Sequence, residues 1–485
     1  MTLLQDLSDR GQTNLYIGGE WRESSDSQPI DVLDPATGET IATVASASSD
    51  DATAAVDAAY EAGARFAATT PLERSELLRK AYELMIDRSE DLAELIVREM
   101  GKALAEARSE VKYAAEFFRW YSGEAVRNLG NISMAPGGDK RIIAIQQPIG
   151  VSLLITPWNF PAAMATRKIA PAIAAGCTMI LKPASDTPLT ALAIAGLLED
   201  AGLPSGVLNV IPSKRSSTVV PVMMNDDRVR MLSFTGSTEV GRVLLEQAAA
   251  TVMKTGMELG GNAPFLVFED ADIDAAVEGV MIAKMRNGGQ SCIAANRIYV
   301  HEAVATEFSK AFTNAMSSLK TGPGLEPGTD LGPIINEGAV NDMRDTVDAA
   351  LSTGSQVATG GSRLDRPGFF FPPTVLTGVD PKADILSKEV FGPVAPIVTF
   401  SSEDEAIEMA NSSIYGLASY LYSSDLARAM RVAEAIEAGM VGVNRGLISD
   451  PAAPFGGVKQ SGLGREGARE GVLEFQETKY IAASW

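Results

Sequence analysis

Hydrophobic residues in the early part of the chain recur with the spacing of amphipathic helices. Residues 49–128 show this rhythm, and the stretch SSDD supplies acidic residues where the first helix would begin. Interruptions of the pattern near Arg88 and Gly101 predict breaks between helices. We therefore predict consecutive helices over this region.

The pattern changes at residues 131–147, which read NISMAPGGDKRIIAIQQ. Two extended stretches flank the turn sequence PGGD, and this arrangement predicts a β-hairpin. An isolated hairpin is only marginally stable in water, so we expect this one to pack on another element, such as a second subunit.

From Gly150 onward, apolar strand patterns alternate with helical ones. VSLLIT, TMILKP, VLNVIP and VRMLSF read as strands, with helical patterns between them, and a second alternating region runs from NAPFLVFED to about Asn444. Such alternation is typical of an α/β fold with doubly wound parallel sheets. No linker-like or low-complexity stretch interrupts the chain, so we expect tightly joined domains.

Composition narrows the possible partners. The chain has 485 residues, 46% of them hydrophobic, and a formal net charge of -21. That charge argues against binding to nucleic acid or to anionic membranes, which attract Lys and Arg. No secretory signal and no spanning segment is recognisable, and two cysteines make no disulfide framework, so we expect a cytoplasmic protein.

The histidine count restricts the chemistry further, because His301 is the only histidine in the chain. Catalytic Ser-His and Cys-His pairs need a histidine base, and zinc sites need histidines or several cysteines. We therefore expect no metal site, and any cysteine nucleophile must be served by a different base.

Cys292 is the strongest candidate for such a nucleophile. It lies in NGGQSCIAANR, just after a predicted helix and among polar residues and glycines. Exposed backbone N–H groups there would lower the pKa of its thiol and favour the reactive thiolate. The alternative is a small buried hydrophobe in a turn. Cys177, in the apolar stretch AIAAGCTMI, is expected to serve packing alone.

Several polar residues follow predicted strands, where parallel sheets usually bind ligands. Glu258 in MELGGNAP is a possible general base if burial raises its pKa, although a solvated loop carboxylate is the alternative. Asn159 in ITPWNFP is able to donate to an oxyanion or simply to form a turn. Lys182 in KPAS and the bend FTGSTEVG, with Gly236 and Gly241, suit a nucleotide phosphate, but the bend is not a P-loop.

Six motifs in this order make the chain resemble the aldehyde dehydrogenase superfamily from about Asp34 to its C-terminus. They are ITPWNFP, LKPAS, FTGSTEVG, MELGGNAP, GGQSC and EVFGPV. The resemblance implies a Rossmann-like cofactor domain, a catalytic domain and a small β oligomerisation domain. The expected ranges are 1–129 and 148–257 for the first, 258–467 for the second, and 130–147 and 468–485 for the third. The final part of the second range is expected to return toward the cofactor domain.

The resemblance also implies a mechanism. Cys292 would attack an aldehyde, the Asn159 amide and the Cys292 N–H would hold the oxyanion, and hydride would pass to the nicotinamide. Glu258 would then activate the water that hydrolyses the thioester. By the same resemblance, the cofactor would contact Ile155, Thr156, Pro157, Trp158, Lys182, Ser185, Gly236, Ser237, Gly241, Leu259, Glu389 and Phe391.

Ser185 bears on the choice of cofactor. Many members of the superfamily that prefer NAD carry Glu at this position, where a carboxylate would repel the 2′-phosphate of NADP. A serine beside Lys182 is instead able to donate to that phosphate. We predict that NADP is preferred and that NAD is also used.

Within the superfamily, WNFPAAMATRK, VGVNRGLIS and APFGGVKQSGLGREG resemble the succinate-semialdehyde dehydrogenases. Arg167, Arg286 and Ser449 match the residues that hold the substrate carboxylate in that group. Glutarate semialdehyde is an alternative if Arg445 points into the site. An aldehyde dehydrogenase of broader specificity is another, and a CoA-acylating or non-catalytic relative is a further one. The resemblance also implies a homodimer or homotetramer. Ala294 replaces a second cysteine found in many relatives, so we expect no disulfide switch.

Overall fold

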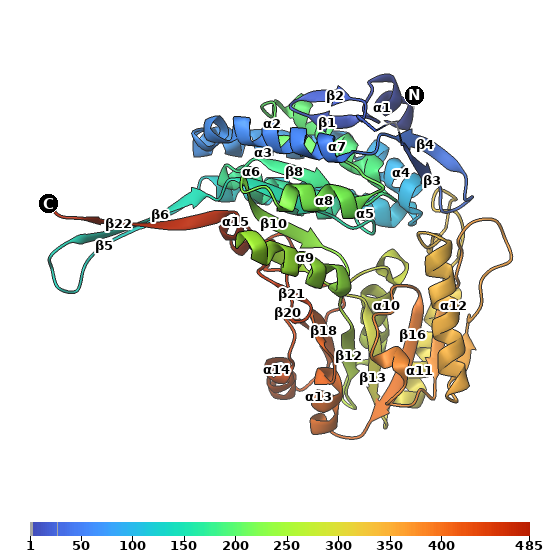
Figure 1. The fold of residues 1–485 in the computed structure, drawn as a ribbon. Helices are drawn as coiled ribbons and strands as arrows, with labels where there is room; N and C mark the ends of the chain where they lie inside the picture. The colour runs from blue at the N-terminus through green and yellow to red at the C-terminus, as the bar shows by residue number, and fades with distance from the viewer. Residues whose placement is uncertain (1–2, 27) are drawn as a thin grey trace.

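The computed structural model describes residues 3–26 and 28–485. Two large sheets, each packed with helices, lie one above the other, and a thin arm projects to one side (Figure 1). The alternation of strand and helix patterns predicts an α/β fold with doubly wound parallel sheets, and the structure confirms it.

The first sheet has eight strands in the order β2-β1-β9-β8-β7-β10-β11-β21. Its five central strands run parallel, while the strands at both edges pair antiparallel. The N-terminal edge strands and the last strand lie outside the sequence-based predictions. The strands are β1 (Leu15–Ile17), β2 (Glu20–Arg22), β7 (Val151–Ile155), β8 (Met179–Lys182), β9 (Leu208–Val210), β10 (Val229–Thr235), β11 (Lys254–Glu258) and β21 (Gly462–Leu463).

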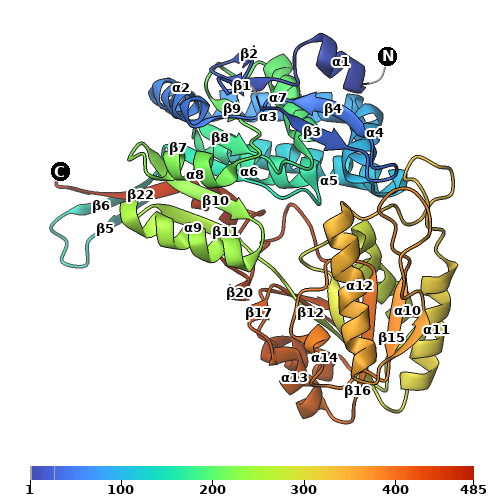
Figure 2. The same cartoon turned by 45° about the vertical axis from the view of Figure 1, so that its right-hand side comes forward.

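Helices cover both faces of this sheet, as the continuous apolar runs of its central strands require (Figure 2). One face packs against α3 to α7 and the other against α2, α8 and α9. The predicted breaks near Arg88 and Gly101 are confirmed. The helices are α2 (Ser49–Ala67), α3 (Pro71–Asp87), α4 (Ser89–Met100), α5 (Leu104–Ala125), α6 (Pro161–Ala175), α7 (Pro188–Ala201), α8 (Ser216–Met224) and α9 (Thr238–Thr251).

The second sheet has seven strands in the order β14-β15-β16-β13-β12-β18-β19, parallel except at β14. Its faces are also covered by helices. The strands are β12 (Ala263–Val267), β13 (Ala295–His301), β14 (Gln356–Thr359), β15 (Thr374–Thr377), β16 (Val394–Phe400), β18 (Ala418–Tyr422) and β19 (Met440–Val443). The helices are α10 (Ile273–Met285), α11 (Ala305–Ser318), α12 (Glu337–Ser352), α13 (Glu403–Asn411) and α14 (Leu426–Ala435).

The arm is the predicted hairpin extended by the last strand of the chain. Strands β5 (Asn131–Met134) and β6 (Arg141–Pro148) flank the predicted turn, and β22 (Gln476–Ala483) pairs antiparallel with β6. All residues of β5 are exposed. The hairpin thus pairs with a third strand of its own chain. The three-stranded arm still projects away from the rest of the molecule (Figure 1).

Short elements complete the fold. They are α1 (Leu3–Asp9), β3 (Ile30–Leu33), β4 (Thr40–Val44), η1 (Arg286–Gly289), η2 (Asp384–Leu386), β17 (Tyr415–Gly416), β20 (Val458–Lys459) and α15 (Glu470–Glu474). Within residues 3–26 and 28–485, no helix combines the length and apolar character that crossing a bilayer would require.

Candidate active site

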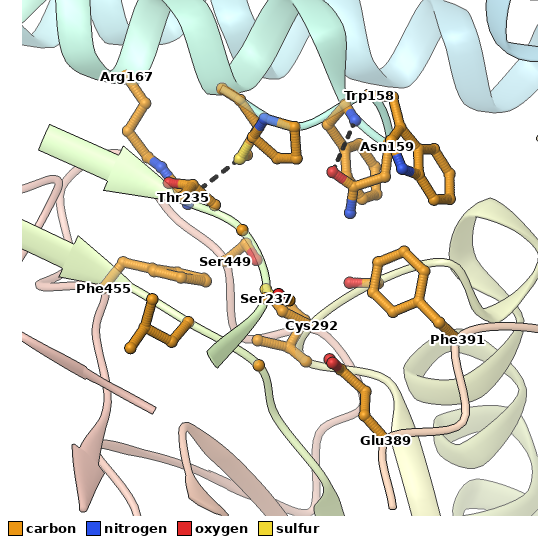
Figure 3. A pocket seen from close by; sticks show the side chains of 18 of the residues that line it. Trp158, Asn159, Arg167, Thr235, Ser237, Cys292, Glu389, Phe391, Ser449 and Phe455 are labelled. Atoms are coloured by element: carbon orange, nitrogen blue, oxygen red, sulfur yellow. Dashed lines mark hydrogen bonds between the residues drawn. The ribbon is translucent and has the colours of Figure 1, made fainter. Parts of the chain in front are cut away.

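A cavity of about 230 Å³ lies where the ends of β7, β10 and β11 meet loops of the second sheet (Figure 3). It collects most of the site residues expected from the sequence. These are Pro157, Trp158, Asn159, Arg167, Gly236, Ser237, Leu259, Arg286, Cys292, Glu389, Phe391 and Ser449. Ile155, Thr156, Lys182, Ser185 and Gly241 do not line it, and Glu258 lines a smaller neighbouring cavity.

Cys292 enters the cavity on a loop that follows α10. In that loop Asn287, Gly288 and Gly289 all have positive φ, and a Cβ on Gly289 would come within 2.2 Å of the Gly392 carbonyl oxygen. A Cβ on Gly261 would likewise come within 2.0 Å of the Cys292 carbonyl oxygen. The glycines of ELGG and GGQSC therefore let two backbone segments approach closely beneath the thiol.

The two cysteines have different environments. Cys292 is half-buried and lines the cavity, whereas the buried Cys177 donates its thiol proton to the Phe475 carbonyl oxygen at 3.2 Å. The sequence predicts a lowered pKa for Cys292, and this is wrong: desolvation raises the pKa of its thiol to about 12. Arg167 opposes that shift by favouring the thiolate, while Glu389 and Glu258 reinforce it.

Asn159 is buried at the turn between β7 and α6, with its side chain directed toward the cavity (Figure 3). Its Nδ2 donates to the Gln290 carbonyl oxygen at 3.0 Å, and its Oδ1 accepts from the Phe160 N–H at 3.1 Å. A primary amide has two N–H bonds. The second is the donor that an oxyanion on a substrate would require.

Glu258 ends β11 and is only 2% exposed. Its Oε2 is buried without a hydrogen-bond partner among the described residues. Burial raises the pKa of this carboxyl group well above its usual value, Glu466 raises it further, and Arg167 opposes both. The sequence predicts that Glu258 could act as a base if burial raises its pKa, and this condition is met. A carboxylate with a raised pKa is suited to accept a proton near neutral pH.

Arg167 and Arg286 reach the cavity from different elements, α6 and η1. Arg167 is 2% exposed, its Nε lies 2.6 Å from Glu466 Oε2, and its guanidinium is 4.2 Å from the Phe455 ring centroid. Arg286 Nη1 donates to Ser449 Oγ at 3.3 Å. Both cations can therefore face a substrate anion, although Arg167 already shares its charge with Glu466.

Glu466 is a functional candidate that the sequence analysis misses. It lies 2.5 Å from the Nζ of Lys168 as well as against Arg167, and these two cations keep the pKa of its carboxyl group low despite burial. Its only sequence signal is its place in the glycine-rich segment GREG. Several apolar and aromatic residues that line the cavity carry no distinctive motif and are not predicted from the sequence: Tyr113, Phe160, Met164, Ile293 and Phe455.

The residues expected to hold a dinucleotide fit that group. Ser237 lines the cavity and caps the N-terminus of α9, where backbone amides suit a phosphate, and a Cβ on Gly241 would clash with Leu259 at 2.4 Å. Glu389 Oε1 accepts from the Gly261 N–H at 3.0 Å, and burial raises the pKa of its carboxyl group to about 7. Trp158 and Phe391 meet edge to face across the same opening.

Lys182 and Ser185 lie farther along the same sheet edge. Lys182 ends β8, is buried, and donates to the Pro183 carbonyl oxygen at 3.1 Å. Burial lowers the pKa of its ammonium group to about 8, and Asp186 opposes this shift. Arg445, by contrast, is exposed and donates to the Leu447 carbonyl oxygen, so the inward orientation on which its substrate role depends is not seen.

Known proteins are closely similar to this chain. The aldehyde dehydrogenase family model matches residues 21–481. A succinate-semialdehyde dehydrogenase of Paenarthrobacter nicotinovorans is 56% identical over 91% of this chain and 98% of its own length. A glutarate-semialdehyde dehydrogenase of Pseudomonas putida is 50% identical, covering 97% of each chain. The crystal structure of an NADP-dependent E. coli enzyme, 47% identical, superposes with a TM-score of 0.97 over 99% of both chains.

Proposed function

We propose, from the premise that the chain belongs to the aldehyde dehydrogenase family, that it oxidises succinate semialdehyde to succinate and prefers NADP over NAD. The chain is an NAD(P)-dependent oxidoreductase that acts on aldehydes. The observation that carries the choice of substrate is that Cys292 shares one cavity with Arg167 and Arg286. An aldehyde that also carries a carboxylate would be bound by these two guanidinium groups, whereas an uncharged aldehyde would not.

The first half of the proposed reaction forms a bond to sulfur. The Cys292 thiol first loses its proton to solvent, because its raised pKa keeps it protonated at neutral pH. The resulting thiolate attacks the aldehyde carbon, and the carbonyl oxygen becomes an oxyanion that accepts from the Asn159 amide and the Cys292 N–H. Bound NAD(P)⁺ supplies a hydride acceptor. Collapse of the oxyanion expels hydride and leaves a thioester on Cys292.

The second half releases the acid. Glu258 takes a proton from a water molecule, whose oxygen attacks the thioester carbon, and the Cys292 thiolate leaves. The raised pKa of Glu258 supports this role, because the carboxylate is a stronger base than an exposed one. Release to water needs no CoA, which separates this proposal from a CoA-acylating enzyme.

Glutarate semialdehyde is the second candidate substrate. A further cavity of about 620 Å³ shares Tyr113, Phe160, Arg286 and Ser449 with the first and extends the site outward. This room favours a chain longer by one methylene group. The similarity to the P. putida enzyme named for that substrate points the same way.

A substrate and cofactor survey tests the proposal. We expect kcat/KM to be highest for succinate semialdehyde, lower for glutarate semialdehyde and lowest for uncharged aldehydes of the same length, with no requirement for CoA. NADP should give a higher kcat/KM than NAD. Equal rates with charged and uncharged aldehydes would contradict the role of Arg167 and Arg286, and a large NAD preference would contradict the interpretation of Ser185.

Assembly and location complete the proposal. The exposed arm formed by β5, β6 and β22 suits a homodimer or homotetramer, as a surface that a second subunit would cover. A nucleophilic thiol must stay reduced, which favours the cytoplasm. Ala294 is buried where many relatives carry a second cysteine, so the proposal includes no intramolecular disulfide switch.

A further inference from the structure

The backbone of Asn159 is held from two directions. Its carbonyl oxygen accepts from Lys102 Nζ at 2.8 Å and from Asn287 Nδ2 at 2.8 Å. Its side-chain amide donates to the Gln290 carbonyl oxygen, which also accepts from Asn287 Nδ2 at 3.1 Å. The proposed oxyanion donor is therefore fixed both to the nucleophile loop and to Lys102.

Lys102 is itself fixed by Glu110. Lys102 Nζ lies 2.5 Å from Glu110 Oε2, and the two side chains are 1% and 0% exposed. The other carboxylate oxygen of Glu110 accepts from the N–H groups of Ala162 at 2.9 Å and Ala163 at 3.3 Å. Since no side chain of its own caps the N-terminus of α6, Glu110 provides that cap from α5.

These bonds link three segments that are distant in the sequence. Lys102 and Glu110 lie just before and within α5, Asn159 precedes α6, and Asn287 belongs to the loop that carries Cys292. Lys102 does not line the catalytic cavity, and its Nζ instead lies 4.1 Å from the centroid of the Phe160 ring behind it. Lys102 thus contacts two residues that line the cavity, Asn159 and Phe160, and of these only Asn159 would donate to the oxyanion.

We propose that the buried Lys102–Glu110 ion pair is a positioning device that aims the Asn159 amide at the oxyanion. The inference rests on the proposed function, because it requires Asn159 to be the oxyanion donor. An oxyanion hole depends on donors that are already oriented before charge develops. A cation bound to the Asn159 carbonyl also polarises the peptide group at the turn and resists its rotation.

A double-mutant cycle between Lys102→Met and Asn159→Ala tests the inference. We expect Lys102→Met to lower kcat about tenfold or more, with KM for succinate semialdehyde nearly unchanged, because the misplaced donor acts in the transition state. In the Asn159→Ala background the same substitution should change kcat by less than about twofold. Lys102→Arg should recover part of the lost rate, because it keeps the charge.

Alkylation of Cys292 by iodoacetamide separates positioning from general damage. This reaction forms no oxyanion, so its rate in Lys102→Met should stay within about twofold of the parent rate. Arg74→Met is the matched control: Arg74 is another buried cation that donates to backbone carbonyl oxygens, those of Thr69 and Ala174, far from the cavity. It should leave kcat unchanged.

The outcomes separate the oxyanion role of Asn159 from the positioning role of Lys102. If Asn159→Ala keeps the parental rate, both the oxyanion role and this inference are wrong. If Asn159→Ala is impaired but Lys102→Met lowers kcat by the same factor in both backgrounds, or slows alkylation in parallel, only the inference is wrong. Should Lys102→Met fail to fold, Glu110→Gln replaces it in the cycle. Its control is Glu99→Gln, because Glu99 is another buried carboxylate that caps a helix, α7.

Discussion

At the scale of single residues, opposite charges surround the half-buried thiol of Cys292. Arg167 favours the Cys292 thiolate, while the carboxyl groups of Glu389 and Glu258 oppose it. Arg167 is also paired with Glu466, so its charge is not fully available to a substrate. The reactivity of Cys292 therefore depends on several neighbours together, and removing any one of them should change more than one step.

Replacing the nucleophile gives the first prediction. Cys292→Ser should lower kcat by at least about 10³-fold, because a serine hydroxyl without an adjacent histidine is a far weaker nucleophile. Steady-state oxidation of succinate semialdehyde measures the loss. Cys177→Ser is the control and should keep the parental rate, since the Cys177 thiol is buried in the core, donates to the Phe475 carbonyl oxygen and does not line the cavity. Parental turnover by Cys292→Ser would refute the mechanism.

Replacing the base gives the second prediction. Glu258→Gln should lower steady-state turnover about 10²- to 10⁴-fold but keep a rapid first release of reduced cofactor, because only hydrolysis of the thioester needs the base. In the parent enzyme the hydrolysis rate should rise with pH through the raised pKa of Glu258, as the carboxylate forms. Stopped-flow measurement across pH checks both points. An unchanged pH profile in the variant would assign the base elsewhere.

Lys182 gives a prediction on pH and cofactor choice. Because the pKa of Lys182 is lowered to about 8, its positive charge should be present below that pH and lost above it. The affinity for NADP should then fall as pH rises through this range, with a smaller change for NAD, which has no 2′-phosphate. Fluorescence titration of the enzyme with each cofactor measures this. Lys182→Arg should remove the pH dependence.

At the scale of elements, the catalytic loop depends on backbone segments that touch. β11 ends at Glu258, and the glycines after it pass directly under the loop that carries Cys292. Gly261 has no room for a side chain, because a Cβ would meet the Cys292 carbonyl oxygen. The same segment bonds to Glu389 through the Gly261 N–H. The close approach of these backbone segments therefore fixes Cys292, Glu258 and Glu389 relative to one another.

Gly261→Ala should therefore damage the site. We expect a lower kcat and a loss of about 1–3 kcal/mol in the free energy of unfolding, because the loop must shift to admit the methyl group. Activity assays and denaturant unfolding measure the two effects. Gly256→Ala on β11 is the control, since its nearest side-chain atom is Met231 Cε at 3.6 Å. Equal behaviour of the two variants would show that the close approach is unimportant.

At the scale of the whole molecule, the arm formed by β5, β6 and β22 exposes apolar side chains that the rest of the chain does not cover. Ile132 and Ile481 each lie opposite Ile143 across neighbouring strands, and they are 60% and 40% exposed. A row of exposed isoleucines on a sheet is an apolar patch of the kind that marks a protein–protein interface. In the proposed assembly, a second subunit covers this face of the sheet.

Charge in this row should weaken assembly. We predict that Ile132→Lys combined with Ile481→Lys shifts the protein from a dimer or tetramer toward smaller species, because a buried lysine pair is unfavourable in an apolar interface. Light scattering after gel filtration measures the molar mass. Thr53→Lys, on the exposed face of α2, should leave the mass unchanged. An unchanged mass in the double variant would place the interface elsewhere.

The sequence by itself determined that strands alternate with helices from Gly150 onward, and it placed Asn159, Lys182 and Glu258 after or at the ends of strands. Such features depend on local periodicity and on short motifs. Only the tertiary structure decided the contact of Lys102 with Asn159, 57 positions apart in the sequence, and those of Glu466 with Arg167 and Lys168, with 298 positions between Lys168 and Glu466. No local pattern specifies such pairs. They form because packing brings distant segments together and buries their charges, and burial in turn sets the pKa values that the chemistry needs.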